Sequence, residues 1–223
     1  MKAHPTQPQT KTLVVLANSC KNNGRCLAGK ALANDRFGAW IRPVSAHPTG
    51  ALTLEHQAFN DSTTPALLDV VTVPVRRPAP LGFQSENHLI HSQYYWSRVG
   101  RLDAARLPEL VDPVAPLWIN GHSTVAGCND RVPEDRLAEL DHSLILIGPV
   151  TVWLHVAWEK LRARFVHQAV TYDLVVTDPD LKAAYAGRPD GVLEQQPNSF
   201  VCVSLAPPWN GYAYKLAAAI LTP

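Results

Sequence analysis

The sequence has little excess charge and no long hydrophobic run. Its 20 Lys and Arg residues against 19 Asp and Glu residues give a net charge of +1. Proteins that hold long duplex nucleic acid by charge alone carry a strong basic excess, which disfavours that mode of binding here. No stretch approaches the roughly 20 apolar residues of a membrane-spanning helix, and the polar first eleven residues do not resemble a secretory signal. We therefore expect a cytoplasmic protein without a membrane partner.

Motifs for metal binding and catalysis are also lacking. The four cysteines are Cys20, Cys26, Cys128 and Cys202. They do not form the two closely spaced pairs of a structural zinc site. Residues 24–30 (GRCLAGK) match part of a phosphate-binding loop, but Ala31 stands where that loop needs a hydroxyl. No G-x-S-x-G sequence is present. We predict no metal, no cofactor and no catalytic residue.

A metal-dependent nuclease remains a third hypothesis. Such an enzyme needs several carboxylates that converge on a metal ion, and the candidates are Asp69, Asp173, Asp178 and Asp180. Asp178 precedes Pro179, which is typical of a helix N-cap followed by proline at the first helical position. Asp69 lies in a predicted strand, where it can simply face solvent.

Short strands dominate the first half of the chain. The 19 prolines against 12 glycines suit short elements with rigid turns. Apolar runs and alternation predict strands at 12–17, 25–32, 39–44 and 67–75, with a short helix at 53–59. Gly29 inside the second strand indicates a bulge or a close backbone approach. The order of three strands, a helix and a strand is that of an OB-type barrel.

The second half shows strand patterns again after an irregular segment. Short helices are predicted at 103–111 and 134–140, a hairpin at 162–166 and 172–177, and strands at 143–156 and 200–205. The run 214–221 fits either helix or strand, since Ala and Leu favour helices. We predict a mainly β protein with two tandem OB-like barrels: a disordered tail (1–11), a first domain (12–95), a connecting segment (96–141) and a second domain (142–223).

Basic and aromatic residues of the first domain are candidates for binding nucleic acid. Alternation along residues 39–42 places Trp40 and Arg42 on one face of a strand and Ile41 on the other. A strand that presents Trp and Arg side by side can stack a base and hold a phosphate. The alternative is that Trp40 packs in the barrel core. Lys21, Arg25 and Lys30 complete this set.

A second cluster lies near the C-terminus. Trp209 follows two prolines, and Lys215 lies close to it in sequence. Asn120 belongs to a long loop rich in amides, a kind of loop that is often functional. These three residues complete the predicted nucleic-acid interface.

Several segments together resemble the bacterial dual OB-containing domain family. The segments are LANSCKNNGRCLAGK, AWIRPVS, LLDVVTVPV, FQSENHLI, LWINGHS, NDRVP, YDLVVTDP and VSLAPPWNGYAYKLAAAI. The resemblance covers about residues 12–221. This resemblance implies two OB-like barrels and a non-catalytic role in binding or sensing nucleic acid, in bacterial defence or conflict systems. It implies no catalytic residue.

Two hypotheses therefore lead. The first is a module that binds single-stranded DNA or RNA, or modified nucleic acid. The second is an interaction or scaffold subunit whose aromatic residues contact a protein partner, which near-neutral charge favours.

Overall fold

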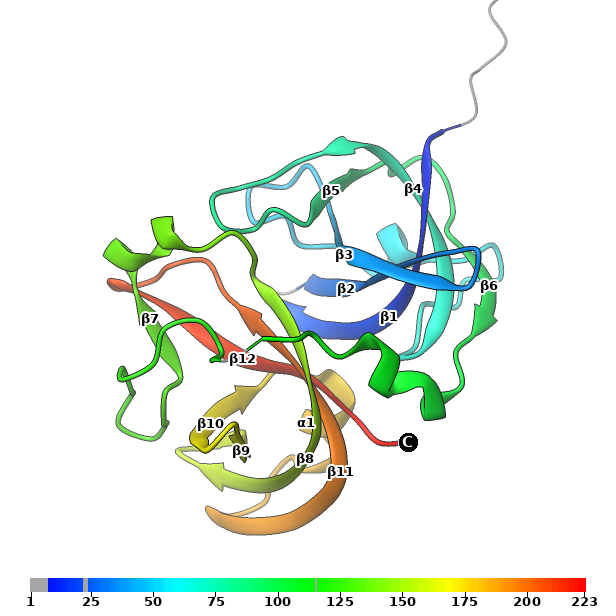
Figure 1. Ribbon diagram of the computed structural model, residues 1–223. Helices are drawn as coiled ribbons and strands as arrows, with labels where there is room; N and C mark the ends of the chain where they lie inside the picture. Colours follow the sequence, from blue (N-terminus) through cyan, green and yellow to red (C-terminus); the bar gives the residue numbers. More distant parts are fainter. Residues whose placement is uncertain (1–7, 22–23, 115) are drawn as a thin grey trace, which may run out of the picture.

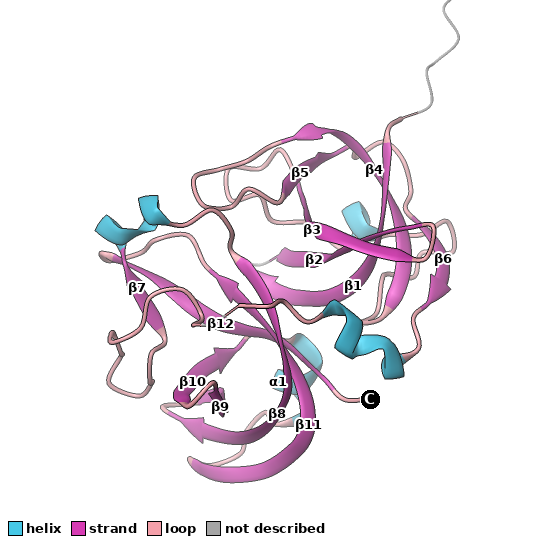
Figure 2. Cartoon of the chain, viewed as in Figure 1, coloured by secondary structure: helices cyan, strands magenta, loops and turns pink. Residues whose placement is uncertain are grey.

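The computed structural model describes residues 8–21, 24–114 and 116–223, and it consists mainly of β-strands. The strands form two six-stranded sheets, one from each half of the chain (Figure 1, Figure 2). The prediction of two tandem barrels is confirmed. Residues 1–7 of the expected tail lie outside the described residues, and Thr10 and Lys11 already belong to the first strand.

The first barrel has the connectivity of an OB barrel. Its strands β1, β2, β3, β5 and β4 pair in that order, and β4 also pairs with β1, which closes the sheet. The pair β3 and β5 is parallel, and a short 3-10 helix lies between β3 and β4 in the chain. The elements are β1 (Thr10–Lys21), β2 (Gly24–Ala33), β3 (Arg36–Val44), η1 (Glu55–Gln57), β4 (Asp69–Pro78), β5 (Asn87–Ile90) and β6 (Ser97–Arg101).

Strand β1 is buried on both faces, which explains its continuous apolar run. Leu13 and Val15 pack in the core of the first barrel. Val14 and Leu16, on the opposite face, pack in a cluster shared with the second barrel. Because successive side chains of a strand point to opposite faces, a strand between two cores needs apolar residues at every position.

Gly29 in β2 marks a close backbone approach, as the sequence predicts. A Cβ atom at this position would lie 1.9 Å from the carbonyl oxygen of Val14. Only glycine fits this distance without displacing β1.

The second barrel repeats the same connectivity. Strands β8, β9, β10, β12 and β11 pair in that order, β11 pairs with β8, and β10 and β12 are parallel. A short helix separates the third and fourth barrel strands, and Asp178 caps it by accepting bonds from two backbone amides, as predicted. The elements are β7 (Arg131–Pro133), β8 (Leu144–Ala157), β9 (Lys160–His167), β10 (Val170–Val176), α1 (Pro179–Ala184), β11 (Gly191–Leu205) and β12 (Tyr212–Leu221).

The expected connecting segment, 96–141, divides between the two sheets. Strand β6 pairs with β4 of the first barrel, and β7 pairs with β12 of the second. The two predicted helices of this segment are 3-10 helices, η2 (Ala104–Leu110) and η3 (Glu134–Glu139). The sequence prediction omitted β5, because its four residues NHLI show no alternation of apolar and polar side chains.

The C-terminal run for which helix and strand remained open is strand β12. It pairs with β11, β10 and β7, and these tertiary contacts outweigh the helix propensity of its alanines. No helix within the described ranges is both long and apolar enough to cross a membrane.

The barrels share an apolar interface. Leu16 and Ala17 of β1 belong to one buried cluster with Leu146 of β8, Phe200 of β11 and Ala219 of β12. Backbone bonding crosses the same boundary, because the Cys20 amide donates to the Thr177 carbonyl oxygen at 2.9 Å. The two barrels therefore meet through packed side chains and a direct main-chain contact.

Candidate nucleic-acid interface

Strands 2 and 3 of an OB barrel form its usual ligand face. In the first barrel these strands are β2 and β3, which carry the predicted residues Lys30, Trp40 and Arg42. Other parts of the protein cover this face in the first barrel. Ile41 is buried in the first core as expected, but Lys30 and Arg42 are buried as well, and Trp40 is half-buried against the shared cluster.

Asp112 holds two of these residues. Its carboxylate accepts from Lys30 Nζ at 2.5 Å and from Trp40 Nε1 at 3.0 Å. The same carboxylate accepts from the backbone amide of Leu146 in β8 at 2.7 Å. Lys30 and Trp40 therefore join the first barrel to the second, which corrects the expectation that they face a ligand.

Arg42 is only 2% exposed. Its backbone amide donates to the Glu86 carbonyl oxygen at 2.9 Å, and its Nη1 lies 3.2 Å from Glu86 Oε1. The expectation that Arg42 projects outward to a phosphate is therefore wrong. The physical reason is that Glu86, 44 positions later, provides a buried counter-charge.

Lys215 and Asn120 form a buried polar contact in the second barrel. Lys215 Nζ donates to the Ile119 carbonyl oxygen at 2.8 Å and to Asn120 Oδ1 at 2.9 Å. Asn120 donates in turn to the Tyr172 hydroxyl at 2.9 Å. Lys215 is 1% exposed, and this burial lowers its pKa to about 7. Both residues fix the 118–131 loop to the barrel, which corrects their expected surface role.

Stability is expected to rise from pH 7 to about pH 8.5 because of Lys215. In the unfolded chain this amine keeps its ordinary pKa of 10.5, whereas in the folded chain its pKa is about 7. Within this window the unfolded state therefore binds more protons, and raising the pH favours folding. Below pH 7 both states are protonated and the slope disappears.

Denaturant unfolding at several pH values measures this effect, with Lys215→Met as the comparison. The variant is expected to lose the positive slope, and an unchanged slope would contradict the assignment. The pH range ends below the ionisation of free thiols. Burial raises the pKa of Cys202, so at higher pH this thiol makes stability fall as the pH rises.

The other three predicted residues differ in their surroundings. The Lys21 side chain lies outside the described part of the structure. Arg25 is half-buried, with Nη1 4.0 Å from Cys20 Sγ. Trp209 is 71% exposed in the loop between β11 and β12.

The corresponding face of the second barrel is open. A groove of about 480 Å³ lies on the outer surface of β8, β9, β10 and β11. Alternation directs Ala163, Phe165 and Tyr172 into the core and places their neighbours on the outer face of the sheet. The groove is lined by six residues: Trp153, His155, Arg164, Val166, Thr171 and Val192.

A buried carboxylate organises the charges of this groove. Asp173 is fully buried, and it accepts from Arg164 Nε at 3.0 Å, from Arg162 Nε at 2.9 Å and from His155 Nε2 at 2.9 Å. Arg162 also donates to Asp130 at 3.2 Å. The Arg164 side chain remains 57% exposed, so its guanidinium is fixed in direction and still accessible.

The register places an indole beside this guanidinium. Trp153 of β8 pairs directly with Arg164 of β9. Sequence reasoning overlooked both residues, although alternation within 150–157 (VTVWLHVA) already put Trp153 and His155 on one face. The sequence alone does not give the register in which β8 and β9 pair.

The carboxylates of the nuclease hypothesis have structural partners. Asp69 lies 3.2 Å from Arg101 and 3.5 Å from Arg98, and Asp178 caps α1. Across residues 8–21, 24–114 and 116–223, no three His, Cys, Asp or Glu side chains form a group suited to a metal ion.

Solved structures with a similar course of the chain include HIN domains. The HINb domain of p204 has 8% identity and a TM-score of 0.35, with 96% of this chain and 97% of that chain covered. The HIN2 domain of tetrameric p202 has 8% identity and a TM-score of 0.32, with 96% and 94% covered. A murine DNA-binding protein bound to double-stranded DNA has 6% identity and a TM-score of 0.28, with 98% and 100% covered.

Sequence comparison is more specific. No curated protein sequence matches the chain significantly. The sequence profile of the dual OB-containing domain matches residues 11–220. Because this match spans nearly the whole chain and both barrels have OB connectivity, the protein belongs to the dual OB-containing domain family.

Proposed function

We propose that the protein is a non-catalytic module that binds single-stranded nucleic acid through the open groove of its second barrel. The observation that supports this most directly is the pairing of Trp153 with Arg164 on the uncovered OB-type face. A base can stack on the indole while the guanidinium contacts a phosphate, which is the usual combination in OB folds that bind single strands.

Charge limits the expected strength of this binding. Arg164 is the arginine that lines the groove, and beneath it the buried Arg162 is balanced by the buried Asp130 and Asp173. Counterion release is therefore small, and stacking supplies a larger share of the affinity than in strongly basic proteins. A role as a sensor in bacterial defence or conflict systems is the wider setting that we propose for this binding.

Trp153→Ala is expected to weaken binding of single-stranded DNA by about 1–3 kcal/mol, because one stacking platform is lost. Arg164→Gln is expected to weaken it too and to lower the salt slope of log K by about 1, because one phosphate contact is lost. Fluorescence anisotropy with a labelled oligonucleotide at several salt concentrations measures both effects.

Tyr95→Ala is the matched control, because Tyr95 is an aromatic residue of the first barrel with 62% exposure. It is expected to bind like the wild type. Unchanged affinity in both groove variants, with circular dichroism showing a native fold, would refute the groove as the interface.

A protein partner is the second candidate, favoured by apolar residues around the same groove. Val166 is 48% exposed, Val192 is 78% exposed, and Trp158 in the turn between β8 and β9 is 70% exposed. Ionic strength separates the two candidates, since an apolar interface is insensitive to salt and a phosphate interface is not.

A further inference from the structure

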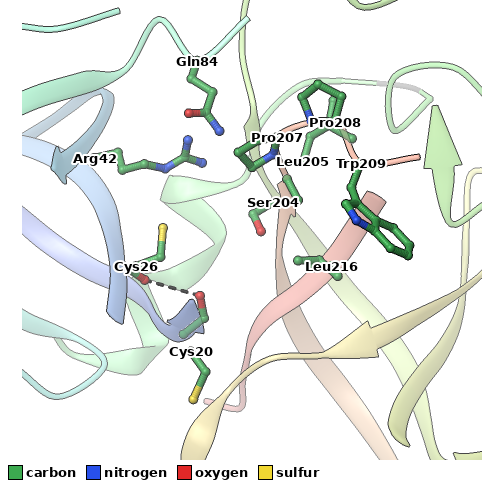
Figure 3. Close-up of a pocket in the computed structure, with 12 residues that line it drawn as sticks. Cys20, Cys26, Arg42, Gln84, Ser204, Leu205, Pro207, Pro208, Trp209 and Leu216 are labelled. Carbon is green, nitrogen blue, oxygen red and sulfur yellow. Dashed lines mark hydrogen bonds between the residues drawn. The ribbon is translucent and has the colours of Figure 1, made fainter. Parts of the chain in front are cut away.

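A second cavity lies between the two barrels, away from the groove. It has a volume of about 400 Å³, within the usual range for small-ligand sites. Its first wall consists of Cys20 and Cys26 on β1 and β2, Arg42 on β3, and Gln84 in the loop before β5. Figure 3 shows the Arg42 guanidinium directed from β3 into this space, with the Gln84 amide above it.

The opposite wall belongs to the second barrel and is mostly apolar. Leu205, Pro207, Pro208 and Leu216 line it. Trp209 flanks the cavity on the side opposite Arg42 (Figure 3). A cavity with an apolar wall and a few directed polar groups is the usual form of a small-ligand site.

The Arg42 side chain has unused hydrogen-bonding capacity. Its Nε and Nη1 atoms are buried, and neither makes a hydrogen bond of good geometry among the described residues, although Nη1 lies 3.2 Å from Glu86 Oε1. Burying such donors costs free energy unless a partner is supplied. Because the end of the guanidinium is directed into the cavity (Figure 3), an acceptor on a bound molecule would meet that end and not the two buried atoms.

The neighbouring amide offers the same kind of group. Gln84 Oε1 accepts from Asn87 Nδ2 at 3.3 Å, which leaves the Gln84 NH2 group for the cavity. Guanidinium and amide donors together require hydrogen-bond acceptors on the ligand.

A ligand with a neutral acceptor edge suits this site better than an anionic ligand. Glu86 lies 3.2 Å from Arg42 Nη1 and is itself buried, so the charge of the guanidinium is already balanced. A phosphate placed here would add an unbalanced negative charge in a desolvated site. A carbonyl oxygen or a ring nitrogen would satisfy the donors without that cost.

The loop that carries Trp209 is held in place. The Trp209 amide donates to the Tyr212 carbonyl oxygen at 2.8 Å, and the Ala206 amide donates to the Tyr214 carbonyl oxygen at 2.9 Å. With two prolines before it, the loop keeps its large indole 71% exposed at the cavity without collapse onto the barrel. An exposed, fixed indole is a stacking surface for a planar ring.

We propose that this cavity binds one carbonyl-bearing nucleobase, whose ring contacts Trp209 and the apolar wall and whose acceptor edge meets Arg42 and Gln84. Guanine fits these donors best, because O6 and N7 are adjacent acceptors, whereas adenine has an amino group at the position of O6. The base can come from a free nucleotide or from a strand that turns one base out. The proposal does not depend on the groove of the second barrel.

Alkylation of Cys26 by N-ethylmaleimide, followed by mass spectrometry, reports occupancy of the cavity. Cys26 lines the cavity, whereas half-buried Cys128 lies beside Thr171 of the groove and serves as the internal control for the free-base and phosphate probes. Guanosine monophosphate, guanosine, adenosine monophosphate, inorganic phosphate and a mixed-sequence single-stranded oligonucleotide are tested separately on the full chain.

Selective slowing at Cys26 by guanosine monophosphate and guanosine, more than by adenosine monophosphate, supports a free base as ligand. Slowing by the oligonucleotide alone supports a base turned out of a strand. Slowing by inorganic phosphate alone overturns the nucleobase assignment, and equal Cys26 rates with every probe overturn the site.

Trp209→Ala provides the second readout. It removes an exposed side chain, so the fold is expected to persist, and affinity for the effective probe should fall about 5- to 150-fold. Tyr95→Ala, with similar exposure on the first barrel, should not change affinity. Equal affinity of folded Trp209→Ala and wild type contradicts the stacking role. Trp153→Ala should leave Cys26 protection by a free base intact, so failure of the groove and failure of the cavity are distinguishable.

Discussion

Replacing Asp112 with alanine is expected to lower the free energy of unfolding by about 3 kcal/mol. Asp112 accepts from the buried ammonium of Lys30, the indole of Trp40 and the backbone amide of Leu146. Its removal leaves a charge and two polar groups without their partner, in a place largely closed to water. Chemical denaturation measures the loss.

Two comparisons separate this effect from a general loss of surface charge. Glu109→Ala breaks a solvent-exposed ion pair with Arg106 and should cost much less than Asp112→Ala. The double variant Lys30→Met, Asp112→Asn should recover part of the loss, because no buried charge is then left unpaired. Equal losses for Asp112→Ala and Glu109→Ala would contradict this account.

Asp173→Asn is the second change with a large expected effect, about 3–5 kcal/mol of unfolding free energy. The amide keeps the shape of the carboxylate but removes the charge that Arg162, Arg164 and His155 share. Arg162 is 3% exposed, so it cannot turn to solvent, and Asp130 alone would balance it.

The same variant connects stability with binding. Loss of the carboxylate also releases the Arg164 guanidinium from its fixed direction, so affinity for single-stranded DNA should fall in parallel at temperatures where the variant is folded. Thermal denaturation and anisotropy check the two effects separately. Asp180→Asn changes an exposed carboxylate in the first turn of α1 and should alter both much less than Asp173→Asn does. A fully stable Asp173→Asn protein would show that Arg162 needs only Asp130.

Local patterns were sufficient to predict much of the fold. Alternation placed Ile41 in a core, the Asp178-Pro179 pair located the start of α1, and the position of Gly29 indicated its contact with β1. These features depend on neighbours within a few positions or on the period of a strand, which is why sequence reasoning finds them.

The candidate site was much harder to predict, because it depends on distant partners. Trp40 and Arg42 do lie on the face opposite Ile41, but Asp112 and Glu86 cover them from positions far along the chain. Alternation indicates on which side a residue lies, and it does not indicate whether protein or solvent occupies that side. The Trp153 and Arg164 pair likewise requires the register of two strands.

The position of strand β1 between the two barrels has a consequence for how the protein unfolds. Its two faces serve different hydrophobic interiors, since Leu13 contributes to one and Leu16 to the other. Cutting the chain between the barrels would expose Leu146 and Phe200 to water on the C-terminal fragment. We therefore expect the two halves to unfold in one cooperative transition and not as two independent domains.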